Sequence, residues 1–322
     1  MLTMAVAATL GHQTPKHLNP MIDLHIAKKP LFGLYMPSNR GAGRGGRGGV
    51  QQADAPPPKT PSQLVQDAFA YPNADFVFDG SMEGDFDRGY TSFAELATAM
   101  ATAGTIEKAP YAHLHHPVAV KTHLIAEDTT LAKQRIAKQL NLGVSTIVFV
   151  GVESANEVKT GLAAMRFKSK GGTRPDDVAS APAFWGMSEK EYKEKADVWP
   201  LNPNGELTNW TIVESKEGLK HVREIAAVKG ISVLFPGAGT LRGVFSTVDS
   251  TTKQRTFDPA GWEAAIQQVL AACKEFNVPC GYPANDPQTV EERMKQGFSV
   301  FVAGWGENGF KAVEYGKKAS GR

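Results

Sequence analysis

Short apolar runs alternate with amphipathic stretches along most of the chain. Eight of the apolar runs are rich in Val, Ile and Phe and show no clean alternation of apolar and polar positions. This pattern is typical of strands that are covered on both faces, and hence of parallel strands. The predicted strands cover residues 32–38, 75–80, 118–124, 145–152, 210–215, 231–238, 278–284 and 299–305.

Each predicted strand is followed by a stretch with helical periodicity. These helices are expected at 62–70, 91–103, 130–141, 154–166, 216–228, 259–276, 287–296 and 307–319. Repeated βα units in one chain of this length predict an α/β fold, specifically a (β/α)₈ TIM barrel. A doubly wound open sheet is the alternative. No GxGxxG motif joins the first strand directly to a helix, and GxxxxGK[ST] is absent, so nothing supports a dinucleotide or P-loop site.

Residues 1–30 are predicted to form an N-terminal segment with a helix, followed by a single barrel domain at 31–322. A helix is expected at about 16–29, with Leu18, Ile22 and Ile26 on one face. The apolar start, residues 1–11, is either a clipped signal remnant or simply the start of the chain.

Two irregular segments interrupt the barrel pattern. Residues 40–61 are rich in Gly and Pro and predict a mobile surface loop; an RGG-type nucleic-acid tether is the weaker alternative, because the segment has no aromatic residue. Residues 168–209 form a long insertion between the fourth and fifth strands that contains Trp185 and Trp199. Such insertions usually act as lids or oligomer contacts.

The composition narrows the class of protein. The chain has 322 residues, 42% of them apolar, and a formal net charge of +2. A balance so close to zero argues against a nucleic-acid platform, and no apolar run is long enough to span a bilayer. Two cysteines, Cys273 and Cys280, exclude a disulfide-rich scaffold and a Cys-rich zinc site. The apolar start and the Gly/Pro-rich spacer suggest an exported or periplasmic protein, with the cytoplasm as the alternative.

Polar side chains gather where several predicted strands end, which in a barrel is the side that carries the chemistry. Asp79 ends the second strand and Glu83 follows it, Lys121 and His123 lie on the third, and Glu214 ends the fifth. A charge inside an apolar run is costly to bury without a partner, so Lys121 and Glu214 predict a site. A structural ion pair of Lys121 with Glu214 or Asp79 is the alternative. By itself Asp79 also fits a turn, and His123 a core histidine.

Two further features carry weaker signals. The backbone N–H groups of Gly237, Ala238, Gly239 and Thr240, after the sixth strand, are suited to holding a carboxylate or phosphate, although plain turn geometry also explains the run. The histidines of the HLHH run are expected at the opposite end of the barrel, at a surface or interface, because they precede the third strand. They are His113, His115 and His116.

The sequence resembles the HpcH/HpaI aldolase and citrate lyase family. The resemblance rests on ISVLFPGAGTLRG and on the stretch from AIQQVLAACKEF to FVAGWG, and it extends back through WTIVES, FVGVESANEVKTGLAAMRF and DFVFDGSMEGDFD. It implies a (β/α)₈ barrel, a metal-dependent pyruvate aldolase and a trimer or hexamer of identical chains. It also implies that Glu214 binds a divalent cation such as Mg²⁺ or Mn²⁺. Lys121 stands where the family usually has an Arg that contacts the keto-acid oxygen, and the 237–240 turn binds the carboxylate.

The chain departs from the family pattern at two positions. Gly239 stands where the family has an Asp that binds the metal, and the His that acts as base after the second strand is absent. Asp249, Glu83 or Asp79 could supply the missing carboxylate, because Mg²⁺ prefers hard oxygen ligands. His123 or Glu83 could replace the missing base.

Three functions are therefore open. The first is a divergent lyase that cleaves or forms a carbon–carbon bond on a 2-keto acid such as pyruvate, with a metal at Glu214. The second is a Schiff-base aldolase that uses Lys121 and no metal. The third is a non-catalytic barrel that binds a small carboxylate or serves in an assembly. A small-molecule carboxylate is the expected partner, and neither nucleic acid nor a membrane is expected.

Overall fold

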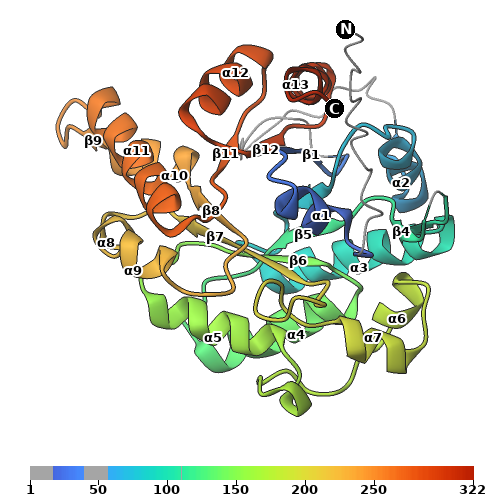
Figure 1. Cartoon of the computed structure of the whole chain (residues 1–322). Coiled ribbons are helices and arrows are strands. Elements are labelled where there is room, and N and C mark those ends of the chain that lie inside the picture. The colour runs from blue at the N-terminus through green and yellow to red at the C-terminus, as the bar shows by residue number, and fades with distance from the viewer. Residues whose placement is uncertain (1–16, 40–56, 110) are drawn as a thin grey trace, which may run out of the picture.

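A computed structural model describes residues 17–39, 57–109 and 111–322. The apolar start at 1–11 and most of the Gly/Pro-rich segment at 40–61 lie outside these residues. Figure 1 shows the described part of the chain as a ring of strands surrounded by helices.

Eight parallel strands form one sheet in the order β11-β12-β1-β2-β5-β6-β7-β8. An isolated parallel bridge between Leu234 and Cys280 joins the two edges, so the sheet closes into a barrel. The predicted (β/α)₈ barrel is therefore confirmed. The strands are β1 (Leu31–Tyr35), β2 (Val77–Asp79), β5 (Val118–Lys121), β6 (Thr146–Phe149), β7 (Thr208–Val213), β8 (Val233–Pro236), β11 (Gly281–Pro283) and β12 (Val300–Ala303).

Most of the helices that follow these strands begin at polar caps. Asp85, Asp128 and Ser154, for example, accept hydrogen bonds from the first turns of α3, α4 and α5. Because of its cap, α3 begins at Phe86, earlier than the predicted start near residue 91. The predicted helix at 216–228 is split at His221 into two short helices. The barrel helices are α2 (Pro61–Phe69), α3 (Phe86–Ala103), α4 (Thr129–Asn141), α5 (Ala155–Met165), α8 (Lys216–Lys220), α9 (Val222–Ala226), α11 (Pro259–Phe276), α12 (Pro287–Gln296) and α13 (Glu307–Ala319).

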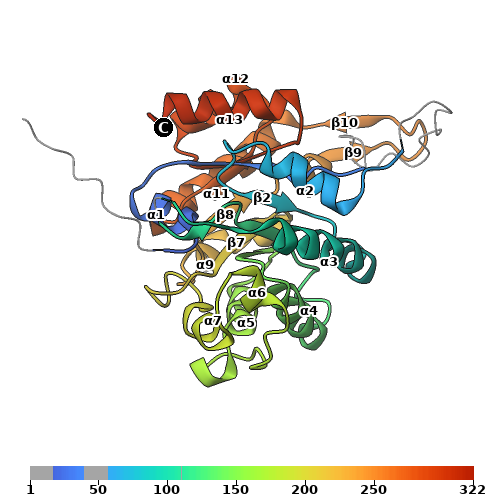
Figure 2. The same cartoon turned by 90° about the vertical axis from the view of Figure 1, so that its right-hand side faces the viewer.

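Two hairpins and the helix that leads into one of them were not predicted. Helix α10 (Ala238–Val244) directly follows β8 and leads into a hairpin of β9 (Ser246–Val248) and β10 (Arg255–Phe257), which projects from the barrel (Figure 2). The guanidinium of Arg242 lies 4.1 Å from the ring centre of Phe257 and ties the hairpin to α10. The second hairpin joins β3 (Ile106–Glu107) to β4 (His113–Leu114).

The insertion at 168–209 lies at the amino-terminal side of the barrel. It contains η1 (Lys168–Lys170), α6 (Ala181–Phe184) and α7 (Glu189–Lys195). The indole of Trp185 donates to the carbonyl of Gly143 at 2.8 Å, and the hydroxyl of Tyr192 donates to that of Leu140 at 3.2 Å. The expectation of a lid is wrong, because the insertion joins the end of a helix to the start of a strand and packs beside α3 and α4.

The predicted N-terminal helix is present as α1 (Pro20–Ile26), and it closes the amino-terminal end of the barrel. Its Met21 belongs to the apolar cluster of the barrel interior. The carboxylate of the buried Glu206 accepts hydrogen bonds from the backbone N–H groups of Leu18 at 3.0 Å and Asn19 at 2.9 Å. These bonds anchor the two residues that precede the helix, and the side chain of Asn19 in turn accepts from the N–H of Met21 in the first turn.

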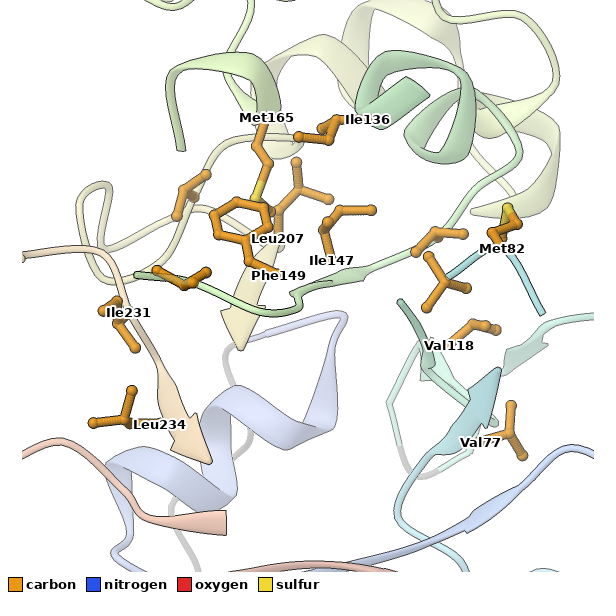
Figure 3. Close-up of a cluster of buried hydrophobic side chains, with 14 of the residues drawn as sticks. Val77, Met82, Val118, Ile136, Ile147, Phe149, Met165, Leu207, Ile231 and Leu234 are labelled. Carbon is orange, nitrogen blue, oxygen red and sulfur yellow. The ribbon is translucent and has the colours of Figure 1, made fainter. Parts of the chain in front are cut away.

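The core has two layers. Side chains that point into the barrel, such as Phe78, Trp210 and Phe235, pack against one another. Side chains that point outward pack beneath the helices: in Figure 3, Ile147 and Phe149 of β6 lie below Ile136 and Met165 of the covering helices. The continuous apolar runs of the strands follow from this burial on both faces.

Cys273 and Cys280 form a disulfide that the sequence analysis did not predict. It links α11 to the residue before β11, at the point where the barrel closes against Leu234. Within the described residues, no helix is long and apolar enough to cross a membrane.

Candidate functional site

A cavity of about 110 Å³ opens at the carboxyl ends of the strands. One wall is apolar, and the polar groups come from strand ends and from the turn after β8. The lining residues are Tyr35, Phe78, Lys121, Val148, Ile212, Glu214, Phe235, Pro236, Gly237, Ala238, Gly239, Thr240, Pro283 and Val302. The structure thus brings together Lys121, Glu214 and the whole predicted turn.

Glu214 is the carboxylate of this cavity, and it directly follows β7. A Cβ atom added at Gly237 would lie 2.3 Å from the Cβ of Glu214 and 2.5 Å from its Oε2, so the carboxylate rests against the turn in space that only glycine leaves open. Burial raises the pKa of Glu214, and hydrogen bonds from the Thr240 hydroxyl and the Gly151 N–H, with the charge of Lys121, act in the opposite direction.

Lys121 ends β5, with its side chain 15% exposed. Its ammonium donates to the Oε2 of Glu83 at 2.8 Å. The sequence left open a structural ion pair of Lys121 with Glu214 or Asp79. In the structure Lys121 pairs with Glu83 instead. The ammonium therefore lines the cavity while it is paired with Glu83, and its charge also acts on Glu214.

Three other predicted residues lie beside the cavity without lining it. The ring of His123 lies 2.8 Å from the carbonyl oxygen of Glu83 through Nδ1 and 2.8 Å from Glu127 through Nε2. Asp79 accepts hydrogen bonds from the N–H of Ser81 at 2.9 Å and from its hydroxyl at 2.5 Å, as a turn residue does. Glu83 reaches the site through Lys121.

The remaining candidates lie elsewhere. Asp249 is in the exposed turn of the β9–β10 hairpin, where it accepts from the N–H groups of Thr251 and Thr252, so it does not supply a carboxylate to the cavity. His113 and His115 line a second cavity of about 600 Å³ beside α1, at the opposite end, as their position before the third strand predicts. The expectation of a surface position is wrong for their neighbour His116, which is buried, and burial lowers its pKa to about 4.

Two polar residues near the site were not predicted from the sequence. Glu153 follows β6, and its Oε1 accepts from the hydroxyl of Ser215 at 2.6 Å, directly beside Glu214. Glu153 directly follows the predicted fourth strand, so its position at a strand end is the sequence signal that marks it. Gln139 of α4 donates to the carbonyl of Lys121, and nothing in the helix pattern marks it.

The arrangement suits a small anion that carries a carbonyl group. One ammonium can face a developing oxyanion, the backbone of a glycine-rich turn can face a carboxylate, and an apolar wall can hold a short carbon chain.

Comparisons with known proteins point to one family. A family model described as HpcH/HpaI aldolase/citrate lyase matches residues 88–313. A 2-dehydro-3,6-dideoxy-6-sulfogluconate aldolase of Pseudomonas putida is 25% identical over 54% of this chain and 61% of its own length. A hydroxypyruvate/pyruvate aldolase of Paraburkholderia phytofirmans is 25% identical over 52% of this chain and 60% of its own length.

The chain thus spans about three fifths of the length of these two relatives. Among solved structures, an HpcH/HpaI aldolase/citrate lyase family protein of Burkholderia cenocepacia superposes with a TM-score of 0.62. The two are 20% identical, and the match covers 94% of this chain and 97% of the other. This likeness supports the barrel fold.

Proposed function

Because the chain belongs to the HpcH/HpaI aldolase/citrate lyase family, we propose that it is a lyase that cleaves or forms a carbon–carbon bond on a small 2-keto acid such as pyruvate. The observation that carries the proposal is the cavity at the barrel mouth, which Lys121 and Glu214 face together with the turn at 237–240. Its volume of about 110 Å³ suits a substrate of a few carbon atoms.

In the proposed complex, the backbone N–H groups of the turn face the substrate carboxylate and the ammonium of Lys121 faces the keto oxygen. The apolar wall formed by Phe78, Ile212 and Phe235 receives the carbon chain. Lys121 then stabilises the negative charge that the keto oxygen gains when the neighbouring carbon becomes nucleophilic.

In the cleavage direction, a base removes the proton from the hydroxyl of a 4-hydroxy-2-keto acid, and the C3–C4 bond breaks. The electron pair of that bond passes to the keto-acid fragment as an enolate, an aldehyde leaves, and a proton returned to C3 gives the keto acid. Glu83 is our first candidate for the base, because its carboxylate already contacts Lys121 at 2.8 Å. His123 is the second candidate, since it is held beside the Glu83 carbonyl. Asp79 has a supporting role, in shaping the turn that carries Glu83.

A divalent cation, Mg²⁺ or Mn²⁺, fits the site at Glu214. Glu214 presents a carboxylate, a hard oxygen ligand, to the cavity, and the ion pair of Lys121 is formed with Glu83. Burial also raises the pKa of the Glu214 carboxyl. Glu214 and the hydroxyl of Thr240 would hold the cation. The described residues include no group of three His, Cys, Asp or Glu that could hold a metal, so substrate and water would complete the ligands. Such a cation would add positive charge beside the enolate.

The test is the aldol reaction itself. Purified protein is incubated with pyruvate, a panel of short aldehydes and Mg²⁺ or Mn²⁺, and the product is followed by NMR. Calorimetry with oxalate, which mimics the enolate, measures binding in parallel. We expect product and metal-dependent oxalate binding; neither product nor binding in any combination would overturn the proposal.

A small-carboxylate-binding barrel is the second candidate, and Gly239 favours it, because a side chain that could bind metal is absent at that place in the cavity. Oxalate binding without turnover would select this function. A Schiff base at Lys121 is the third, and reduction with borohydride in the presence of pyruvate tests it. Mass added to the peptide that contains Lys121 would establish the imine.

Two further proposals concern the protein in solution. We propose a homo-oligomer, a trimer or hexamer, on the resemblance to the family alone; sedimentation as a monomer at micromolar concentration would contradict it. We also propose export, because disulfides such as Cys273–Cys280 persist in oxidising compartments. The mass of the native N-terminus tests export directly.

A further inference from the structure

Gln139 connects the two segments that carry Lys121 and Glu83. Its side chain, from the last turn of α4, is fully buried at 0% exposure. The Nε2 atom donates to the carbonyl oxygen of Lys121 at 2.9 Å. The same atom lies 3.5 Å from the Sδ of Met82, the residue before Glu83.

The two contacts span two different βα units. Lys121 ends β5, whereas Met82 lies in the turn between β2 and α3. The 2.8 Å ion pair of Lys121 with Glu83 joins the same two segments on the cavity side. Gln139 therefore contacts both segments that carry the Lys121–Glu83 ion pair, from within the protein rather than from the cavity.

The amide of Gln139 is energetically unfavourable in this buried position. Its neighbours on the buried face of α4, such as Ile136 and Leu140, are apolar. Its Oε1 atom is buried and has no hydrogen-bond partner among the described residues. A buried polar atom without a partner costs free energy, so an apolar side chain of the same length would suit the packing better. What the amide adds is a donor aimed at the backbone of Lys121.

We propose that Gln139 is a positioning residue, which fixes the backbone of Lys121 relative to the Glu83 turn and so sets where the ammonium stands in the cavity. The inference rests on the proposed function, since it assigns Gln139 to the same site. Small errors in the placement of such a group lower turnover steeply, because the charge must meet the oxyanion at the moment it forms.

The test uses two substitutions of nearly equal volume. Gln139→Met keeps the length and removes the donor. Gln139→Glu removes the donor when the carboxyl is ionised and restores an O–H donor when it is protonated. Asn141→Ala is the matched control, because Asn141 lies on the same helix but accepts from Arg174 at 2.8 Å, away from the cavity. Thermal unfolding of all four proteins reports on the fold.

We expect Gln139→Met to lower kcat for pyruvate aldol addition about tenfold or more while KM for pyruvate changes less. The activity of Gln139→Glu relative to wild type should rise as the pH falls and its carboxyl becomes protonated. Asn141→Ala should lower the unfolding temperature without changing kcat. Loss of stability in Gln139→Met with kcat unchanged, or a pH-independent ratio for Gln139→Glu, would overturn the inference.

Failure of the proposed function looks different. If wild type binds oxalate but produces no aldol, the lyase proposal falls, and Gln139 is judged by oxalate affinity in the same four proteins. A drop of about tenfold in Gln139→Met alone supports the positioning role, and an unchanged affinity overturns it. If wild type neither turns over nor binds oxalate, both proposals are overturned.

Discussion

Lys121 and Glu83 come from different βα units and meet in a 2.8 Å ion pair beside the cavity. The Glu83 side chain is 38% exposed, so the pair contributes little to stability and its effect is mainly on the position of the ammonium. Lys121 is held within reach of the cavity, close enough for its charge to act on Glu214. This relationship underlies the first prediction.

Lys121→Met should abolish stabilisation of the keto oxygen and lower kcat about 10²- to 10³-fold. Lys121→Arg keeps the charge and should retain a larger share of activity, although a guanidinium has a different shape from an ammonium. Steady-state kinetics on pyruvate addition measures both. Equal activity of Lys121→Met and wild type would remove Lys121 from the mechanism.

Glu214→Gln should make the protein more stable and less active. Burial raises the pKa of Glu214 above its unfolded value, so the folded state binds the proton more tightly and stability falls as pH rises through the folded pKa. Glu214→Gln has no charge to bury, so its stability does not fall in this way as the pH rises. We expect an unfolding temperature higher by about 1–3 °C at pH 8, little difference near pH 4, and no oxalate binding. A Glu214→Gln protein that is less stable than wild type at pH 8 would contradict the burial argument.

Gly237→Ala should displace the Glu214 carboxylate, because the added Cβ would lie 2.3 Å from the Cβ of Glu214. We expect loss of oxalate affinity and destabilisation of about 1–3 kcal/mol, measured by calorimetry and urea unfolding. Gly243→Ala is the control, since Gly243 lies in α10, the helix that Gly237 caps, and its added Cβ would meet no atom within 4 Å outside the adjacent backbone of that helix. Equal effects of the two substitutions would show that the close approach at Gly237 has no special role.

The closure of the barrel by α1 should weaken in acid. His25 stacks on Trp199 with 5.8 Å between ring centres, and burial lowers its pKa to about 4. The contribution of neutral His25 to the free energy of unfolding is present above the unfolded pKa of 6.5 and is lost as pH falls towards about 4. His17 acts in the opposite sense, because the Glu206 carboxylate, 3.5 Å from its Nδ1, raises its pKa, and its contribution to stability is lost as pH rises.

His25→Phe isolates the first effect, since it keeps a ring against Trp199 and removes the titration. Between pH 6.5 and 4 it should lose less stability than wild type, by up to about 3 kcal/mol. Parallel pH–stability curves for the two proteins would show that His25 does not titrate in this way.

Reduction of the Cys273–Cys280 disulfide should destabilise the barrel where β8 and β11 close the sheet. For so short a loop, the loss of the cross-link's effect on the entropy of the unfolded chain should lower the free energy of unfolding by about 2–3 kcal/mol. Urea unfolding with and without a dithiol reductant measures it, and a double substitution to Ser is the matched control. We expect hydrogen exchange to increase first in β8 and β11, because only a single bridge at Leu234 joins these strands. Uniform exchange across the barrel would contradict a local role.

The amino-acid sequence by itself determined the alternation of strands and helices, and through it the parallel barrel. It also determined that Lys121, Glu214 and the 237–240 turn share one end, since the carboxyl ends of parallel strands in a barrel meet on the same side. These conclusions need only periodicity and chain direction. Only the tertiary structure decided which groups are in contact. Lys121 pairs with Glu83, and Gln139 contacts the segments that carry both. Asp249 and the insertion lie away from the site. Such contacts join residues from different elements, and their distances depend on how whole helices pack, which no local pattern of residues encodes.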